Sequence, residues 1–247
     1  MKKIPKQPII NYFDAGLMPY NVAWDLQKEL QAQLIDQKRF PEKYVNTPKL
    51  NNLLMFVEHP HVYTLGKSGK ESHLLVNQEQ LNEYEATYVK IDRGGDITYH
   101  GPGQIVGYPI LDLDFFTTDI HVYLRNLEEV MIHVCLEYGL ETDRSKGETG
   151  VWHNHEKICA MGIKCSRWVT MHGFALNVNT DLSYFGHIIP CGIQNKGVTS
   201  LEKLTNSPLL IDEVKQKIIH HFGQVFGATM AKTDNSTVLT QGLTNSI

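Results

Sequence analysis

The sequence predicts a single domain of mixed α/β class. Stretches with apolar residues at helical spacing are interspersed with short apolar runs of strand length, and these runs are more clustered than regular strand–helix–strand repeats would give. Neither an internal repeat nor a linker of changed composition divides the 247 residues. We therefore expect one domain over residues 1–228, followed by a flexible C-terminal tail at 229–247 that is rich in Ser, Thr, Asn and Gln.

Three stretches have the apolar spacing of amphipathic helices, namely residues 20–39, 119–138 and 211–226. In the first, Val22, Leu26, Leu30 and Leu34 recur with charged and amide residues between them. Gly139 follows the second stretch and is a typical C-terminal helix cap. These positions predict three helices with one apolar face each.

Short apolar runs predict the strands. Residues 52–58 have the length and apolarity of a strand buried on both faces. Strand character returns at residues 104–111, directly after a glycine-rich stretch, and further strands are predicted at 150–153, 157–164 and 168–177. Residues 64–69 contain two glycines and are predicted to form a loop.

Composition excludes several classes of protein. A net charge of −4 gives no electrostatic footprint for nucleic acid. The basic N-terminus has no apolar run behind it, and no stretch of apolar residues is long enough to span a membrane. Four scattered cysteines are too few for a disulfide scaffold. We therefore expect a cytoplasmic protein with reduced thiols.

The segment 93–104, Arg-Gly-Gly-Asp-Ile-Thr-Tyr-His-Gly-Pro-Gly-Gln, is the most informative part of the chain. Its glycines allow backbone to approach a ligand closely, with Arg93 and His100 toward the two ends. No helix follows it, so neither a Walker loop nor a dinucleotide-binding fingerprint fits. By itself such a segment is more often an ordinary turn between strands.

Two further residues could carry chemistry. Cys191 lies between a proline and a glycine, where a thiolate could approach a ligand, although a single cysteine is more often a small buried hydrophobe. Lys157 begins a strand, where a lysine is usually a surface charge and is occasionally a proton carrier. The twelve histidines match no structural zinc spacing, so we expect no metal. His172-Gly173 repeats the form of His100-Gly101, and both could line one cavity.

In their joint order, these segments resemble the octanoyltransferase family of lipoate biosynthesis. The matching segments are Glu58–Pro60, Tyr63–Gly66, Arg93–Gln104, Gly150–Trp152, Lys157–Ile158, Ala160–Ile163, His172–Asn177, Pro190–Gly192 and Thr199–Leu201. The resemblance implies the fold of biotin and lipoate protein ligases, with helices flanking a mixed sheet. It also implies transfer of an octanoyl group from octanoyl-acyl carrier protein to a lysine of a lipoyl domain, through a thioester on the enzyme.

Carried over residue by residue, the resemblance makes Cys191 the nucleophile and Lys157 its catalytic partner. The substrate-binding residues that it implies are Arg93, Gly94, Gly95, Asp96, Ile97, Thr98, Tyr99, His100, Ala160, Met161, Gly162, Gly173, Phe174 and Ala175. The implied acceptors are lipoyl domains of 2-oxoacid dehydrogenases and the glycine cleavage H protein, and the implied enzyme is a monomer without a cofactor. Because acyl carrier proteins are acidic, a locally basic face is expected, and its candidates are Lys67, Lys70, Arg93, Lys164 and Arg167.

Three alternatives remain at this point. An ATP-dependent lipoate–protein ligase would share the fold but make no use of Pro190-Cys191-Gly192. A non-catalytic module would bind acylated carriers without needing Cys191 as a nucleophile. A zinc-dependent hydrolase would lose its activity with a chelator.

Overall fold

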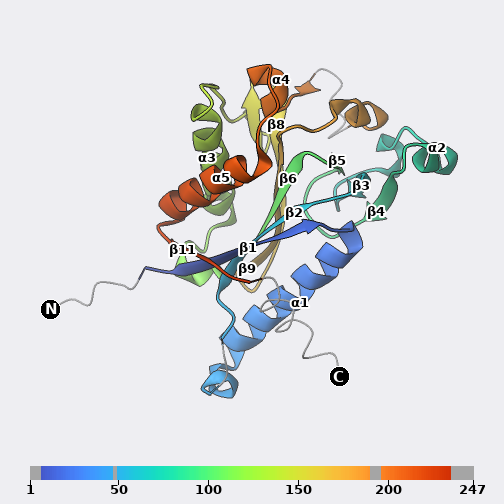
Figure 1. Ribbon diagram of the computed structural model, residues 1–247. Helices are drawn as coiled ribbons and strands as arrows, with labels where there is room; N and C mark the ends of the chain where they lie inside the picture. Colours follow the sequence, from blue (N-terminus) through green and yellow to red (C-terminus); the bar gives the residue numbers. More distant parts are fainter. Residues whose placement is uncertain (1–6, 47–48, 190–195, 235–247) are drawn as a thin grey trace.

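The computed structural model describes residues 7–46, 49–189 and 196–234 (Figure 1). Within these residues, eight strands form one mixed sheet and three form a smaller sheet. Along the large sheet the order is β10 (Gly197–Val198), β8 (Glu156–Ser166), β9 (Val169–Asn177), β6 (Gln104–Ile110), β2 (Asn52–Glu58), β1 (Ile9–Leu17) and β11 (Thr229–Lys232), and β7 (Val151–His153) also pairs with β8. The small sheet has the order β4 (Thr87–Lys90), β3 (Val62–Leu65) and β5 (Ile97–His100).

Helices cover both faces of the large sheet (Figure 1). Helices α3 (Ile120–Leu136) and α5 (Ile211–Phe226) pack together on one face, and α1 (Tyr20–Arg39) covers the other. The short helices α2 (Gln78–Glu83) and α4 (Leu201–Thr205), and the 3₁₀ turns Pro41–Tyr44, Glu71–His73, Leu113–Phe115 and Leu182–His187, lie in connections. Because both faces are covered, every residue of β6 and β9 is buried.

Local sequence explains where the main helices begin and end. Asp119 caps α3, because its side chain accepts hydrogen bonds from the backbone N–H groups of His121 and Val122. Gly227 ends α5 in the left-handed conformation, with φ of 59°. The apolar face predicted for residues 20–39 is buried at Leu26, Leu30 and Leu34, while the first position expected on it, at residue 22, is exposed.

The structure confirms most of the predicted elements. Helices span 20–39, 120–136 and 211–226, and strands occupy 52–58, 104–110, 151–153, 156–166 and 169–177. The fold class, a mixed sheet flanked by helices, is also as predicted. Residues 64–69 were expected to form a loop, but the first two belong to β3, which pairs with β4 and β5. A four-residue strand before glycine carries too little pattern to be distinguished from a turn.

The boundary predicted for the C-terminal tail is wrong for its first residues. Thr229–Lys232 forms β11, which pairs in parallel with β1. This pairing joins residues 220 positions apart in the sequence (Ile9 with Thr229), so no local signal announces it. Residues 235–247 lie outside the described part of the chain.

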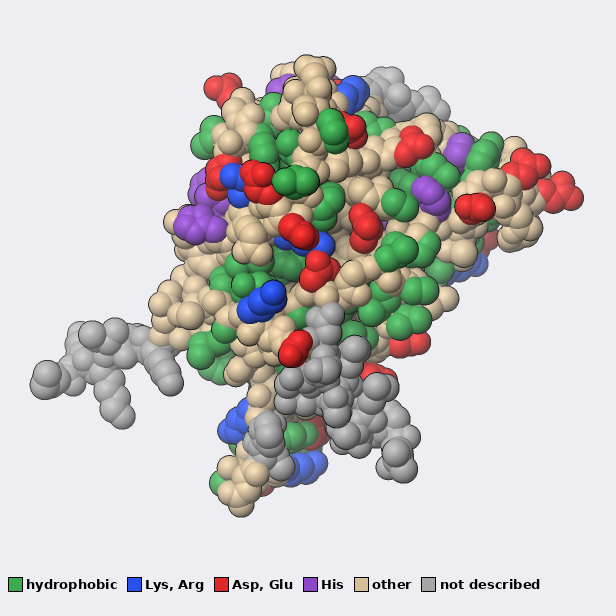
Figure 2. All heavy atoms as spheres, in the orientation of Figure 1, with side chains coloured by type: hydrophobic (Ala, Val, Ile, Leu, Met, Phe, Trp, Pro, Cys, Tyr) green, Lys and Arg blue, Asp and Glu red, His purple; other side chains and the backbone are tan. Residues whose placement is uncertain are grey.

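Two surface properties bear on partners. None of the helices in the described ranges combines the length and apolarity that crossing a bilayer requires. On the face shown in Figure 2, acidic and basic side chains are interspersed and form no large patch of one sign.

Candidate active site

A cavity of about 500 Å³ lies where β5, β6, β8 and β9 meet the loop between β4 and β5. This volume is typical of small-molecule sites. Its lining residues are Tyr20, Arg93–Thr98, His100, Gln104, Val106, Tyr108, Leu124, Gly147–Thr149, Trp152, Lys157, Ala160–Ile163, His172–Ala175, Asn177, Phe185 and Lys196–Val198. The cavity therefore joins segments that lie up to 178 positions apart, from Tyr20 to Val198.

The middle of the cavity is lined by small residues on paired strands. Gly162 faces Gly173 and Ala160 faces Ala175 in the β8–β9 register. A Cβ atom at Gly162 would lie 2.9 Å from the carbonyl oxygen of Gly94, so only glycine lets the 93–95 loop lie on the sheet here. The N–H of Gly94 donates to the carbonyl of Ile163 at 2.9 Å and fixes that position.

Arg93 stabilises the loop that it begins. Its guanidinium donates to the carbonyl and hydroxyl oxygens of Thr64 at 2.9 and 3.0 Å, and to the carbonyl of Gly94 at 3.0 Å. Of the candidates for a basic face, Arg93 is buried and Lys164 is ion-paired with Asp92. Lys67, Lys70 and Arg167 are exposed.

Two lysines lie against one aromatic ring at the end of the cavity near β7 and β10, which we call the Lys157 end. Lys157 Nζ lies 4.6 Å from the centre of the Trp152 ring, and Lys196 Nζ lies 4.7 Å from it. Such contacts stabilise ammonium groups that are partly removed from water. Lys196 also forms an ion pair of 2.6 Å with Glu148, which offsets one positive charge.

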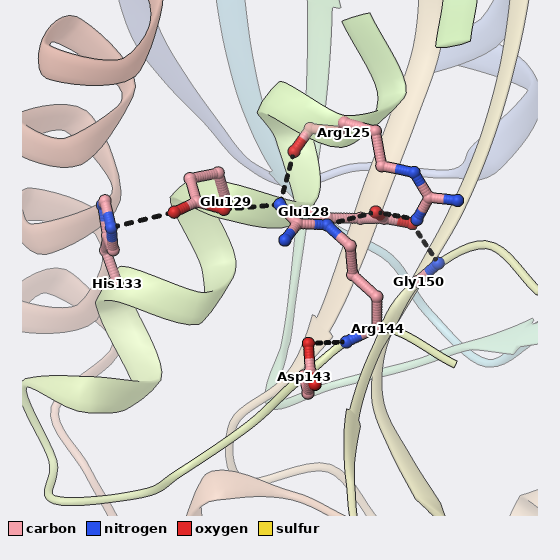
Figure 3. A network of polar contacts seen from close by, with 7 residues as sticks. All are labelled: Arg125, Glu128, Glu129, His133, Asp143, Arg144 and Gly150. Atoms are coloured by element: carbon pink, nitrogen blue, oxygen red, sulfur yellow. Dashed lines mark hydrogen bonds and ion pairs between the residues drawn. The ribbon is translucent and has the colours of Figure 1, made fainter. Parts of the chain in front are cut away.

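A buried carboxylate organises the wall beside Lys157 (Figure 3). Glu128 is fully buried on α3 and accepts hydrogen bonds from Arg125, from Arg144 Nε at 3.0 Å and from the N–H of Gly150 at 3.0 Å. A Cβ atom at Gly150 would lie 3.5 Å from Cε of Lys157. The network therefore holds the backbone that packs against the lysine stem.

The opposite end of the cavity, which we call the His172 end, is lined by His172, Tyr20 and Tyr108. His172 Nε2 donates to Asp92 Oδ1 at 2.9 Å, and Lys164 contacts the other oxygen of Asp92 at 2.5 Å. Burial lowers the pKa of His172 to about 4, although the hydrogen bond to Asp92 opposes this. Burial disfavours the charge of Asp92, but Lys164 and His172 outweigh it and lower the pKa of the carboxyl group to about 2. The imidazole is therefore neutral and the carboxylate charged at neutral pH.

The backbone of His172 is strained, with φ of 58° in the left-handed region. The surrounding structure holds it there, because the His172 N–H donates to the Gln27 side chain at 2.8 Å and the residue lies within the β8–β9 ladder. Strained backbone that is held by its neighbours is frequent at functional sites.

All but one of the substrate-binding residues predicted within the described chain line this cavity. The exception is Tyr99, which is buried on the other face of β5, where its hydroxyl hydrogen-bonds His61 at 2.7 Å. The reason is the alternation of side chains along a strand, since its neighbours Thr98 and His100 both line the cavity. His100 and His172 line one cavity, as their repeated form suggested.

Two cysteines, Cys159 and Cys191, lie close in sequence to residues of the cavity, and they differ. Cys191 lies outside the described residues, although Phe185 before it and Lys196 after it both line the cavity. Cys159, only two residues from Lys157, is fully buried in the main core, and burial raises the pKa of its thiol well above the usual range. Cys159 is therefore a core residue with an unreactive thiol.

Sequence reasoning missed several residues of the cavity. Tyr20 begins a helix, Tyr108 lies in an apolar strand and Lys196 follows the cysteine motif, so none has a local signal of its own. Trp152 belongs to a segment that carries the family resemblance, which was its only signal. Within the described ranges, no group of three or more His, Cys, Asp or Glu side chains is placed to hold a metal ion.

Known proteins resemble this chain in sequence and in fold. Residues 19–223 match the family described as the lipoyl protein ligase A/B catalytic domain. An octanoyltransferase of Flavobacterium johnsoniae is 58% identical over 221 residues, covering 87% of this chain and 95% of that protein. An octanoyltransferase of Christiangramia forsetii is 53% identical, covering 87% and 94%.

Among solved structures, a putative lipoate protein ligase from T. acidophilum superposes with a TM-score of 0.68 at 13% identity, covering 96% of this chain and 92% of that one. A lipoate-protein ligase A bound with ATP superposes with a TM-score of 0.67 at 13% identity, covering 95% and 93%. At such low identity these structures show a shared fold and nothing finer.

Proposed function

Because this chain belongs to the lipoyl protein ligase A/B catalytic family and is an octanoyltransferase within it, we propose that it moves an octanoyl group from octanoyl-acyl carrier protein to a lysine of a lipoyl domain through a thioester on Cys191. The acceptors are lipoyl domains of 2-oxoacid dehydrogenases and the glycine cleavage H protein, and the reaction takes place in the cytoplasm. Lys157 is the catalytic partner of Cys191.

One observation carries this proposal: the cavity joins an acyl-sized, mostly uncharged middle to Lys157, on the side where the described chain resumes after Cys191. The strand β10 follows that segment and pairs with Glu156 and Lys157. The N–H of Thr199, just beyond β10, donates to the Lys157 carbonyl at 3.0 Å. Residues 197–199, which follow Cys191 in the sequence, therefore lie beside Lys157.

The first half-reaction exchanges one thioester for another. The thiolate of Cys191 attacks the carbonyl carbon of the donor thioester, a C–S bond to Cys191 forms, and the C–S bond to the carrier breaks. The ammonium of Lys157 supplies the proton that the departing carrier thiolate takes. A nearby ammonium also favours the thiolate form of Cys191 by charge attraction.

The second half-reaction forms an amide. The amine of the acceptor lysine attacks the acyl-enzyme carbonyl, a C–N bond forms, and the C–S bond to Cys191 breaks. Lys157, neutral after the first half-reaction, takes the proton that the amine loses. The acceptor amine enters this step neutral, its ammonium proton having been lost to solvent, and the cycle ends with the Cys191 thiolate and the Lys157 ammonium restored.

The middle of the cavity provides binding energy for the chain. Burial of a methylene group is worth about 0.8 kcal/mol, so the six methylenes of an octanoyl group supply roughly 5 kcal/mol before the costs of ordering. Gly162, Gly173, Ala160 and Ala175 leave room for this chain because their side chains are absent or small.

Intact-mass spectrometry after mixing the protein with octanoyl-acyl carrier protein tests the covalent step. We expect one octanoyl adduct that maps to Cys191 and is removed by hydroxylamine. The variant Cys191→Ser should form no hydroxylamine-labile adduct and lose transfer, whereas Cys165→Ala, which removes a half-buried thiol away from the cavity, should behave like the parent. An adduct on another cysteine, or full transfer by Cys191→Ser, would overturn the covalent mechanism.

The same preparation separates this proposal from an ATP-dependent ligase. A ligase would form an acyl adenylate from free octanoate or lipoate and ATP, without acyl carrier protein. We expect no adenylate and no ATP requirement. Formation of adenylate at a rate comparable to transfer would favour the ligase.

A further inference from the structure

The Lys157 end of the cavity gathers positive charge around the carboxylate of Glu148. The ammonium nitrogens of Lys157 and Lys196 both lie within 4.7 Å of the centre of the Trp152 ring, so twice that distance is the largest separation that they can have. Glu148 lines the cavity and forms an ion pair of 2.6 Å with Lys196. Two ammonium groups therefore lie close to this carboxylate.

Among the lining residues of the described chain, only Asp96 and Glu148 carry carboxylates, and they differ in what they can bind. Asp96 is buried, with one oxygen 2.6 Å from His73 Nδ1 and the other accepting from the N–H of Ile97 at 2.7 Å. The Glu148 side chain is 19% exposed, and Lys196 contacts it through Oε2. Because a carboxylate offers about four acceptor positions, Glu148 can bind a second cation.

Glu148 lies on the same wall of the cavity as the Lys157 stem. Gly150, two residues after Glu148, packs against that stem, since a Cβ atom there would lie 3.5 Å from Lys157 Cε. The backbone of Gly150 is held in turn by its hydrogen bond of 3.0 Å to the buried Glu128. A group bound by Glu148 would therefore be close to Lys157.

Glu148 is negatively charged at neutral pH. Burial opposes its charge, but Lys196 and Lys157 outweigh burial and lower the pKa of the carboxyl group below its ordinary value. Lys196 also donates to the Ser145 hydroxyl at 3.0 Å, so one lysine holds both Glu148 and the turn that precedes it. The carboxylate thus has a defined place and a permanent charge.

The two substrates of the proposed reaction differ in the charge that they bring to this end. The octanoyl thioester is uncharged, whereas the acceptor lysine arrives as an ammonium group, because the ordinary pKa of lysine is about 10.4. A further ammonium group is repelled by those of Lys157 and Lys196, and it loses part of its hydration as it enters the cavity. The charge of Glu148 offsets both costs.

We propose that Glu148 binds the ammonium group of the acceptor lysine before that group loses its proton to solvent, and thereby determines the affinity for the acceptor. This inference rests on the proposed function, because it requires the acyl-enzyme carbonyl to lie beside Lys157. Lys196 competes for the same carboxylate and offsets its charge. Removal of Glu148 and removal of Lys196 should therefore have opposite effects on acceptor binding.

The experiment measures the two half-reactions separately. Intact-mass spectrometry follows acyl-enzyme formation from octanoyl-acyl carrier protein, and then discharge of the isolated acyl-enzyme at several concentrations of a lipoyl domain. Glu148→Gln should raise the half-saturating acceptor concentration about tenfold and change the rate of acyl-enzyme formation less than threefold. Lys196→Met, which keeps the stem on Trp152, should lower the half-saturating concentration several-fold.

Glu156→Gln is the matched control. Glu156 adjoins Lys157 in sequence, but its carboxylate pairs with the exposed Lys203 and does not line the cavity. This variant removes a negative charge near Lys157 from outside the proposed site. It should therefore leave both half-reactions within twofold of the parent.

Small nucleophiles test the role of charge without any contact between protein surfaces. In neutral solution n-butylamine is an ammonium ion, as the lysine side chain is, whereas hydroxylamine is uncharged. Glu148→Gln should slow discharge of the acyl-enzyme by n-butylamine about tenfold, and discharge by hydroxylamine less than twofold.

The outcomes are separable. A half-saturating acceptor concentration within threefold of the parent in Glu148→Gln would overturn the proposal. Unchanged or weaker acceptor binding in Lys196→Met would do the same, because an ion pair with a purely structural role loses its support from either side. Equal slowing with n-butylamine and hydroxylamine would also overturn it, since charge would then play no part. Failure of the parent to form an acyl-enzyme would instead contradict the proposed function.

Discussion

The two ends of the cavity stabilise their buried polar groups in different ways. At the Lys157 end, ammonium groups lie on Trp152 and an ion pair with Glu148 offsets part of their charge. At the His172 end, imidazoles are kept neutral by burial, and their tautomers are set by acceptors that cannot change, the Met18 carbonyl and the Asp92 carboxylate. The proposed function makes the first end the reactive one, while hydrogen bonds at the second end fix which imidazole nitrogens carry protons. One cavity thus joins an end where charged groups are stabilised by an aromatic ring and an ion pair to an end where burial keeps imidazoles uncharged.

Of the substitutions that test this difference between the two ends, replacement of Lys157 should have the largest effect. Lys157→Met keeps most of the stem but loses the ammonium, so we expect transfer to fall by about a thousandfold or more, within the range that general acid–base groups contribute. Single-turnover transfer from octanoyl-acyl carrier protein measures it. Lys203→Met removes an exposed lysine whose partner, Glu156, adjoins Lys157, and should change the rate less than twofold. A Lys157→Met variant within tenfold of the parent would show that this end is not reactive.

The wall beside Lys157 should depend on its buried carboxylate. Glu128→Ala leaves Arg125, Arg144 and the Gly150 N–H without their shared acceptor, and loss of one partner in a buried ion pair typically costs roughly 3 to 5 kcal/mol. Urea unfolding measures the free energy of unfolding. Glu129→Ala, on the same helix but half-buried, should cost about 1 kcal/mol. Equal losses in the free energy of unfolding for the two variants would show that Glu128 stabilises the protein no more than Glu129 does.

Acid should destabilise the His172 end. Burial lowers the pKa of both His59 and His172 to about 4 from an ordinary value near 6.5, so in this range the unfolded chain binds protons that the folded protein does not. Above about pH 6.5 these neutral imidazoles do not lower the free energy of unfolding. As the pH falls toward 4, the free energy of unfolding decreases by about 3 kcal/mol for each imidazole. Asp92, whose pKa is lowered to about 2, adds a loss only below about pH 4.

Urea unfolding between about pH 7 and pH 4.5 checks this prediction. His172→Asn should lose less stability than the parent over that interval, since one of the three buried imidazoles, those of His59, His100 and His172, is gone. His121→Asn, an exposed histidine at the start of α3, should follow the parent. An unchanged pH dependence in His172→Asn would mean that His172 is not held neutral by burial.

The middle of the cavity, which separates the two ends, should set how far an acyl chain extends. Ala160→Leu adds three carbons opposite Ala175 and excludes about as many methylenes, which corresponds to roughly 2 kcal/mol or a 30-fold loss of kcat/KM for octanoyl transfer. Butyryl transfer by the same variant is the internal control and should be nearly unchanged. A similar loss of kcat/KM with both acyl groups would indicate that the substitution disrupts the whole site and does not simply shorten the cavity.

Local patterns determined much of this molecule. The helices at 20–39 and 211–226 and the strand at 52–58 were predicted to their end residues, because spacing, caps and apolar runs act over a few neighbouring positions. The glycine segment 93–104 was expected to lie between strands, but it contains a strand of its own, β5 (Ile97–His100). Among the described residues, the family resemblance selected ones that the structure brings to one cavity, except Tyr99, which lies on the other face of β5. Cys191 lies outside the described residues.

Only the tertiary structure decided the rest. The pairing of β11 with β1, the placement of Tyr20 beside Tyr108, and the contact of two lysines with Trp152 join residues that are distant in sequence. The burial that keeps His59 and His172 neutral likewise comes from neighbours on other elements. The sequence alone thus determined the main helices, most of the central strands and the family, whereas long-range packing decided which side chains share the cavity.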